Sequence, residues 1–175
     1  GAIDIPNDKY VTPSGIYEAF SELLGTAKCD QYKNALSDYI DLHPEKLLRT
    51  TNLNSVDFLS QLEQQKFDVG IARGGGILRK KFIESFRLGI LNLHGAGPLP
   101  YYRGLGSLEF ALVEGQPLYL NIHYIDSGID TGPVLEKIPF HLDGINNLNH
   151  LYAKIHIMGI DALVSMTSKL MGGTI

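Results

Sequence analysis

Two polar side chains of the segment Asn92-Leu93-His94 have the chemistry of an acyl-transfer site. The segment ILNLH (90–94) is strand-like, and side chains two residues apart on a strand share a face, so Asn92 and His94 can share a target. A carboxamide can donate to a developing oxyanion, and an imidazole can move a proton or donate a second hydrogen bond. Such residues beside a loop also commonly bond its backbone, and that alternative stays open at this point.

The loop DSGIDTG (126–132) places two carboxylates four residues apart between glycines. A turn built from Asp and Gly is one interpretation. The triplet Asp130-Thr131-Gly132 also matches the catalytic triplet of aspartic proteases, which act through two carboxylates that share a proton. An aspartic protease would be an all-β chain, and the helical patterns around the loop argue against this interpretation.

A third candidate is the glycine run after Arg73, which joins the strand-like FDVGIA (67–72) to the helical pattern ILRKKFIESF (77–86). Glycines let a ligand approach the backbone, and a helix N-terminus offers free N–H groups. The run has neither the glycine spacing of a dinucleotide-binding loop nor the Lys-Ser/Thr ending of a P-loop. It is therefore weak evidence for nucleotide binding, and a simple tight turn remains the alternative.

The other reactive side chains carry weaker signals. Tyr102 and Arg103, in the run Tyr101-Tyr102-Arg103, can stack on and clamp a substrate, or they can pack on the surface. Cys29 has no neighbouring base in the sequence, so a nucleophilic role is only a default hypothesis. No metal-binding spacing is present, and we interpret the remaining histidines as surface or hydrogen-bonded side chains: His43, His123, His141, His150 and His156.

The helices and strands that position these groups can be predicted from alternating patterns in the sequence. The predicted helices cover residues 16–24, 56–66, 77–86, 107–114 and 148–170, and the predicted strands cover 67–72, 90–94, 117–125 and 133–140. We expect Gly25 to end the first helix, and Ser55 and Ser107 to cap two others. This alternation predicts an α/β sheet, parallel at least in its centre, with ligand-binding loops after its strands.

Composition narrows the class of protein. The chain has 175 residues, of which 44% are hydrophobic and 19% charged, so it folds, and we expect a single domain. The net charge of −4 offers no general attraction to nucleic acid, which makes a nucleic-acid partner an unfavoured hypothesis. No apolar run is long enough for a membrane span, and the single Cys29 fits a reducing compartment, so we predict a soluble, cytoplasmic protein. The sequence does not indicate an oligomeric state.

Four segments together resemble the catalytic domain of the 10-formyltetrahydrofolate-dependent formyltransferases, from about residue 45 to 140: FDVGIARGGGIL, LGILNLHGAGPLPYYRG, ALVEG and IHYIDSGIDTGPVL. The resemblance implies a Rossmann-like, mostly parallel twisted sheet flanked by helices. It also implies one catalytic domain over residues 1–175 with an atypical or truncated N-terminal portion. The loop after His94 differs from the family's usual His-x-Ser-Leu-Leu-Pro, because it lacks the Ser and is one residue longer.

The resemblance assigns roles to three groups of residues. It implies that Asn92, His94 and Asp130 are catalytic, with Asp130 orienting His94 and helping to pass a proton. It implies that Tyr102 and Arg103 contact the acceptor. It places the folate pocket at Arg73, Gly74, Gly75, Gly76, Ile77, Leu78, Asp126, Ser127 and Gly128.

The implied activity is transfer of a formyl group from 10-formyltetrahydrofolate to a primary amine of a small acceptor, without a metal. Arg103-Gly104 resembles the corresponding residues of the family branch that acts on nucleotide-linked amino sugars or aminoacyl-tRNA. The net negative charge of the chain favours the amino sugar over the tRNA. Two alternatives stay open. One is a formyl-folate hydrolase, and the other is a folate-binding module of the same fold that has lost its chemistry.

Overall fold

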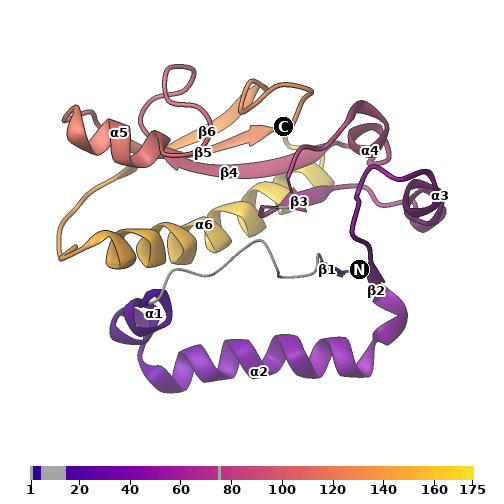
Figure 1. Ribbon diagram of the computed structural model, residues 1–175, viewed down its shortest axis with the longest axis horizontal. Helices are drawn as coiled ribbons and strands as arrows, with labels where there is room; N and C mark the ends of the chain where they lie inside the picture. The colour runs from indigo at the N-terminus through magenta and orange to yellow at the C-terminus, as the bar shows by residue number, and fades with distance from the viewer. Residues whose placement is uncertain (1, 5–14, 75) are drawn as a thin grey trace. The chain divides into compact units, whose positions relative to one another are not determined.

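The computed structural model describes residues 2–4, 15–74 and 76–175, which form helices and strands in alternation (Figure 1). The elements in chain order are β1 (Ala2–Asp4), α1 (Ile16–Leu24), α2 (Thr26–Leu42), the 3-10 helix η2 (Pro44–Lys46), β2 (Leu47–Arg49), α3 (Val56–Gln65), β3 (Gly70–Ala72), α4 (Lys80–Glu84), β4 (Ile90–Ala96), α5 (Ser107–Val113), β5 (Leu118–Tyr124), β6 (Val134–Phe140) and α6 (Leu148–Met171). None of the helices in these ranges is long and apolar enough to cross a membrane.

The strands form two sheets with mixed directions. In the larger sheet the order is β3-β4-β5-β6, with β3 and β4 parallel and the other two pairs antiparallel. In the smaller sheet β1 and β2 pair in parallel. The predicted α/β class is confirmed, but the larger sheet is mixed rather than mostly parallel. Only the loop 125–133 joins β5 to β6, and it is too short for a helical crossover, so β6 runs back beside β5.

The residues divide into two compact units, 1–52 with 142–157 and 53–141 with 158–175. The expectation of a single domain over residues 1–175 stays a prediction. The first unit contains α1, α2 and the start of α6. Within it the Nε2 atom of buried His150 bonds the Glu22 carboxylate, and Phe20 lies edge-on to His156 with ring centroids 6.1 Å apart.

The second unit holds the larger sheet, and β4 is central to it. Leu93 faces Gly159 of α6, where a Cβ atom on the glycine would lie 2.0 Å from a Leu93 methyl carbon. Asn92 and His94 alternate with Leu93 and so face the opposite side, where Ser107 of α5 meets His94. Figure 1 shows α5 and the last turns of α6 on opposite sides of this sheet.

Local sequence signals predict several boundaries correctly. Gly25 ends α1, and the Ser55 hydroxyl accepts a hydrogen bond from the Phe58 amide, so both of these expectations are confirmed. The cap at Ser107 is wrong: Gly106, at φ 76°, precedes α5, and the Ser107 side chain makes no cap bond. Its hydroxyl lies instead 3.1 Å from the Nε2 atom of His94.

Other elements differ from the prediction in length or presence. Strand β3 covers only 70–72, and α4 covers only 80–84, each shorter than its sequence pattern. Helix α2 has no counterpart in the prediction. Among its described side chains Cys29 is buried and most others are exposed, so the helix has no apolar stripe that could mark it.

Candidate active site

Asn92, His94 and Asp130 meet at one point beside β4. The Nδ1 atom of His94 lies 3.4 Å from one oxygen of the Asp130 carboxylate, and the Nδ2 atom of Asn92 lies 3.4 Å from the other. The side chains of His94 and Asp130 are 11% and 15% exposed, so this ion pair is largely shielded from solvent. The structure therefore brings together the three predicted catalytic side chains, whose catalytic role stays a prediction.

The backbone of the loop after β5 aims Asp130 at this point. Asp130 has a left-handed conformation, with φ 48°, which Asp tolerates better than most residues. The amide of Gly104, in the loop after β4, donates to a carboxylate oxygen at 2.9 Å. At the start of the loop Asp126 accepts hydrogen bonds from the Gly128 amide and the Thr131 hydroxyl. The two loops are thus fastened to each other through Asp130.

Gly132 allows this loop to pack closely against the end of β5. A Cβ atom on Gly132 would lie 1.9 Å from the carbonyl oxygen of Tyr124, and main-chain atoms cannot rotate away. We expect Gly132→Ala to lower the free energy of unfolding by about 1–3 kcal/mol and to reduce turnover, because the displaced loop carries Asp130. Urea unfolding and the steady-state rate measure the two effects. Ile129→Ala, at an exposed position of the same loop, is the control, and equal stability of the two variants would contradict the prediction.

His123 is a fourth member of this cluster, which the sequence did not single out. It is buried on β5 directly opposite Asn92, and its Nε2 atom lies 3.4 Å from Asp130 and 3.2 Å from the Asn92 amide nitrogen. Its Nδ1 atom lies 2.8 Å from the carbonyl oxygen of Tyr124. A carbonyl only accepts hydrogen bonds, so Nδ1 donates to it, and this bond orients the ring with Nε2 toward Asp130 and Asn92. The antiparallel register that creates this contact has no signal in the spacing of the residues.

These contacts keep the Asp130 carboxyl ionised. The hydrogen bond with His123 is the main cause that lowers its pKa to about 2, and the Gly104 amide and the positive charge of His94 act in the same direction. Burial acts in the opposite direction and is outweighed. A carboxylate with this pKa is a weak base, which suits a group that holds a cation better than one that stores a proton.

The lowered pKa of Asp130 predicts an acid-sensitive contribution to stability. The folded pKa of about 2 lies below the ordinary value of 3.8, so the contribution is present above about pH 4 and is lost as the pH falls toward 2. It amounts to about 2 kcal/mol. Between about pH 4.5 and pH 2 we expect the free energy of unfolding to fall by about 2 kcal/mol more in the native chain than in Asp130→Asn. Urea titrations at several pH values measure this difference, and parallel curves would contradict it.

Both nitrogens of the His94 ring face oxygen atoms. Nδ1 faces Asp130, and on the other side of the ring the Nε2 atom lies 2.9 Å from the main-chain oxygen of Tyr102 and 3.1 Å from the hydroxyl of Ser107. The carbonyl of Tyr102 only accepts hydrogen bonds, so the Nε2 atom donates to it. The ring of His94 is thus held by oxygen atoms on both sides.

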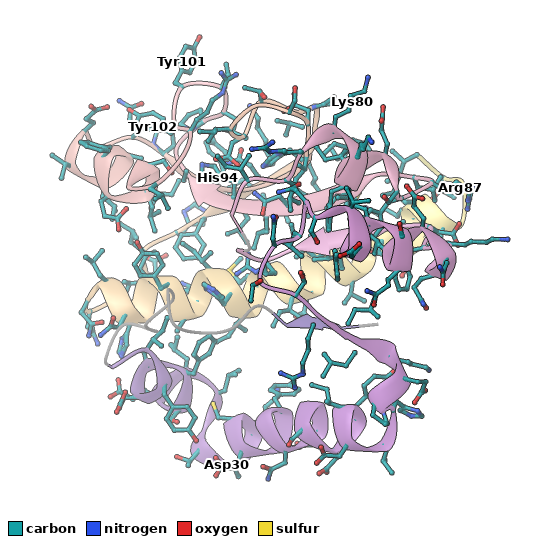
Figure 2. All side chains as sticks on the ribbon, turned by 45° about the vertical axis from the view of Figure 1, so that its right-hand side comes forward. Asp30, Lys80, Arg87, His94, Tyr101 and Tyr102 are labelled. Carbon is teal, nitrogen blue, oxygen red and sulfur yellow. The ribbon has the colours of Figure 1, made fainter. Side chains whose placement is uncertain are left out.

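The predicted acceptor-binding residues lie in the loop between β4 and α5. The Tyr102 ring rests against Gly97, and its hydroxyl donates to Glu114 at the end of α5. Figure 2 shows Tyr101 pointing away from the sheet, and Arg103 is also exposed. Tyr102 thus supports the loop, and the acceptor contacts of Tyr102 and Arg103 stay predictions.

The predicted folate-binding residues occupy the loops after β3 and β5. Arg73 donates to the carbonyl oxygen of Leu93 at 3.4 Å, which ties the end of β3 to β4. Gly74 and Gly76 are both left-handed, with open space where a Cβ atom would lie, and Gly75 lies outside the described residues. Ile77 is 73% exposed, which leaves an apolar surface beside this open backbone.

The four remaining predicted folate residues lie in a buried position after the glycine run and in the turn after β5. Leu78 is buried, and Asn54 holds the loop before it by donating to the Ile77 carbonyl at 2.9 Å. Asp126, Ser127 and Gly128 form an exposed turn that is closed by the Asp126 carboxylate. An open glycine backbone with an apolar edge fits a flat heterocycle such as the pteridine of a folate.

A separate hollow of about 540 Å³ lies beside α3 and α4. Charged side chains of both signs line it, and Figure 2 shows one of them, Arg87, extending away from the ribbon. None of the predicted site residues lines this hollow, so it is distinct from the cluster around Asp130. Within the described ranges, no group of three His, Cys, Asp or Glu side chains is arranged to hold a metal ion.

The family model described as formyl transferase matches residues 24–167, which include the whole Asn92, His94 and Asp130 cluster. The chain belongs to the formyl transferase family. A methionyl-tRNA formyltransferase from Flavobacterium psychrophilum is 28% identical over 162 residues, which are 92% of this chain and 51% of that relative. The chain therefore spans about half the length of this curated relative.

Solved formyl transferases share the fold. A sugar N-formyltransferase from a Shewanella species superimposes with a TM-score of 0.60 and 17% identity, over 93% of this chain and 68% of that one. A formyltransferase from Anoxybacillus kamchatkensis, solved with UDP-4,6-dideoxy-4-formamido-L-AltNAc and tetrahydrofolate, gives a TM-score of 0.56 and 21% identity, over 78% and 72%. This likeness confirms the Rossmann-like formyl transferase fold, to which the mixed sheet belongs.

Proposed function

We propose that this formyl transferase chain moves a formyl group from 10-formyltetrahydrofolate to a primary amine, with Asn92, His94 and Asp130 as its catalytic residues. The observation that carries the proposal is that two donor side chains converge on one shielded carboxylate within a chain of this family. The folate supplies the one-carbon unit. The open glycines after β3 and the exposed Ile77 support its binding there.

The side chains of the cluster have complementary roles. The Asn92 amide and the His94 ring are donors that stabilise negative charge on an oxygen atom of the reacting carbonyl. Asp130 orients the His94 ring, as the carboxylate of a catalytic triad does. Because the pKa of Asp130 is about 2, its role is electrostatic. The amine nitrogen bonds to the formyl carbon, the bond between that carbon and the folate nitrogen breaks, and the amine proton passes to the folate nitrogen.

The acceptor that we propose is a small amine, with a nucleotide-linked amino sugar as the first choice. The net charge of −4 gives the chain no general attraction to a tRNA backbone, and exposed Arg103 offers a planar cation for a phosphate. A relative named for methionyl-tRNA and a fold neighbour bound to a nucleotide sugar make these two acceptor classes the ones to compare. A cytoplasmic location stays a prediction.

One set of measurements tests the proposal and its alternatives. The full protein is incubated with 10-formyltetrahydrofolate and a panel of amino sugars, aminoacyl-tRNA and glycinamide ribonucleotide, and the formylated product is measured by mass spectrometry. We expect product with an amino sugar. Formate release without any amine would indicate the hydrolase, and folate binding without product would indicate the binding module. Failure to bind any folate would contradict all three.

A further inference from the structure

Asn121 is a fully buried polar residue of β5 that lies directly opposite His94 in the sheet. Its Nδ2 atom donates to the carbonyl oxygens of His94, at 3.1 Å, and of Gly97, at 3.3 Å. Since both partners only accept, the amide group has one possible orientation. That orientation leaves its Oδ1 atom buried without a partner in the part of the chain that the structure describes.

The two bonds of Asn121 act on the loop that holds the His94 ring. Gly97 lies directly under the ring of Tyr102, because a Cβ atom at Gly97 would be 2.5 Å from a carbon of that ring. The main-chain oxygen of Tyr102 in turn lies 2.9 Å from the Nε2 atom of His94. Asn121 is thus linked to the His94 imidazole through successive contacts of Gly97 and Tyr102.

The sequence of this loop explains why such a support is needed. Gly95 and Ala96 end β4 and Gly97 begins the loop, so no side chain between His94 and Pro98 can make a hydrogen bond, and this segment is one residue longer than the usual family pattern. Asn121 supplies the missing bonds from the neighbouring strand. A leucine at this position would avoid the cost of an unpaired buried oxygen, so stability alone does not account for the amide.

We propose that Asn121 is a positioning residue, which fixes the end of β4 and the loop 97–102 so that the His94 ring is held between Asp130 and Tyr102. The proposal rests on the proposed function, because it concerns the same catalytic histidine. In the described structure the Asn121 side chain donates its hydrogen bonds to main-chain oxygens, and it acts on the reaction through His94.

Lys137 provides a matched control. It lies on β6 and pairs with Asn121 of β5, so that His94, Asn121 and Lys137 form one row across β4, β5 and β6. Its Nζ atom donates to the carbonyl oxygen of Leu99 at 3.0 Å, in the same loop. Lys137 is exposed, and water can replace its hydrogen bond, whereas no water reaches Asn121.

The test compares Asn121→Leu, which keeps the branched shape and removes the donor, with Lys137→Met in the full protein. We expect Asn121→Leu to lower kcat by about 10- to 100-fold while KM for the folate changes by less than about threefold, because the histidine is displaced and the binding surface is not. Lys137→Met should change kcat by less than about twofold. Asn121→Ser provides the second variant if the leucine variant does not fold.

A second readout does not depend on turnover. The ¹⁵N chemical shifts of the His94 ring report its hydrogen bonds in the full protein without substrate. We expect the chemical shift of Nε2 to change in Asn121→Leu and to remain the same in Lys137→Met. If the native protein formylates no amine, the proposed function fails, and this resonance still tests the positioning. An unmoved resonance, an unchanged kcat, or a loss of kcat that matches the loss of folded protein would overturn the inference.

Discussion

Asp130→Asn is expected to lower kcat by about 10³- to 10⁴-fold, the largest loss from any single substitution in this chain. The carboxylate faces His94 and His123 at 3.4 Å each and receives the Gly104 amide at 2.9 Å. An asparagine has nearly the same shape, but it carries no negative charge to hold the His94 ring. Its NH₂ group must also point at the Gly104 amide or the Asn92 amide, which both donate to the carboxylate.

The measurement for Asp130→Asn is the steady-state rate with the best acceptor of the panel, together with folate binding by calorimetry. We expect folate binding to be retained, because Asp130 accepts its hydrogen bonds from within the cluster. Asp161→Asn on the exposed surface of α6 provides the control for loss of one negative charge. A kcat within about threefold of the native value would remove Asp130 from the mechanism.

Asn92→Ala is expected to lower kcat by about 10²- to 10³-fold, as the loss of one oxyanion donor does in other acyl-transfer sites. The amide of Asn92 also bonds Asp130 at 3.4 Å and lies 3.2 Å from His123, so its removal leaves two buried groups short of a partner. The effect on kcat should therefore come with a modest loss of stability of about 1–3 kcal/mol.

Two measurements separate these effects for Asn92→Ala. Turnover at saturating substrate gives kcat, and urea unfolding gives the stability, so the rate can be taken under conditions where the variant is fully folded. Asn146→Ala, an exposed position before α6, is the control. Near-native turnover by folded Asn92→Ala would show that the amide is a structural member of the cluster and not a donor to the reaction.

Local rules account for the parts of the fold that could be predicted from the sequence. Gly25 ends α1 and Ser55 caps α3 because these effects depend on a few neighbouring residues. The same rules failed where a distant partner competes: the Ser107 hydroxyl meets His94 instead of capping α5. Helix α2 was missed because it has almost no buried face to produce a periodic pattern.

The residues of the candidate site also divide into those that the sequence predicted and those that it did not. The period of two along a strand placed Asn92 and His94 on one face, and resemblance to the family added Asp130. The contacts of His123 and Asn121 depend on the antiparallel pairing of β5 with β4, which sets Asn92 opposite His123 and His94 opposite Asn121. A one-residue shift in that pairing would turn both side chains to the other face of the sheet.

The sequence by itself determined the α/β class, the family and the donor pair at the end of β4, because these follow from residue types and short spacings. Only the tertiary structure decided the directions of the strands, the convergence on Asp130 and the supporting roles of His123 and Asn121. The physical reason is that strand pairing joins residues about 30 positions apart, and its register is fixed by the burial of whole faces rather than by any local motif.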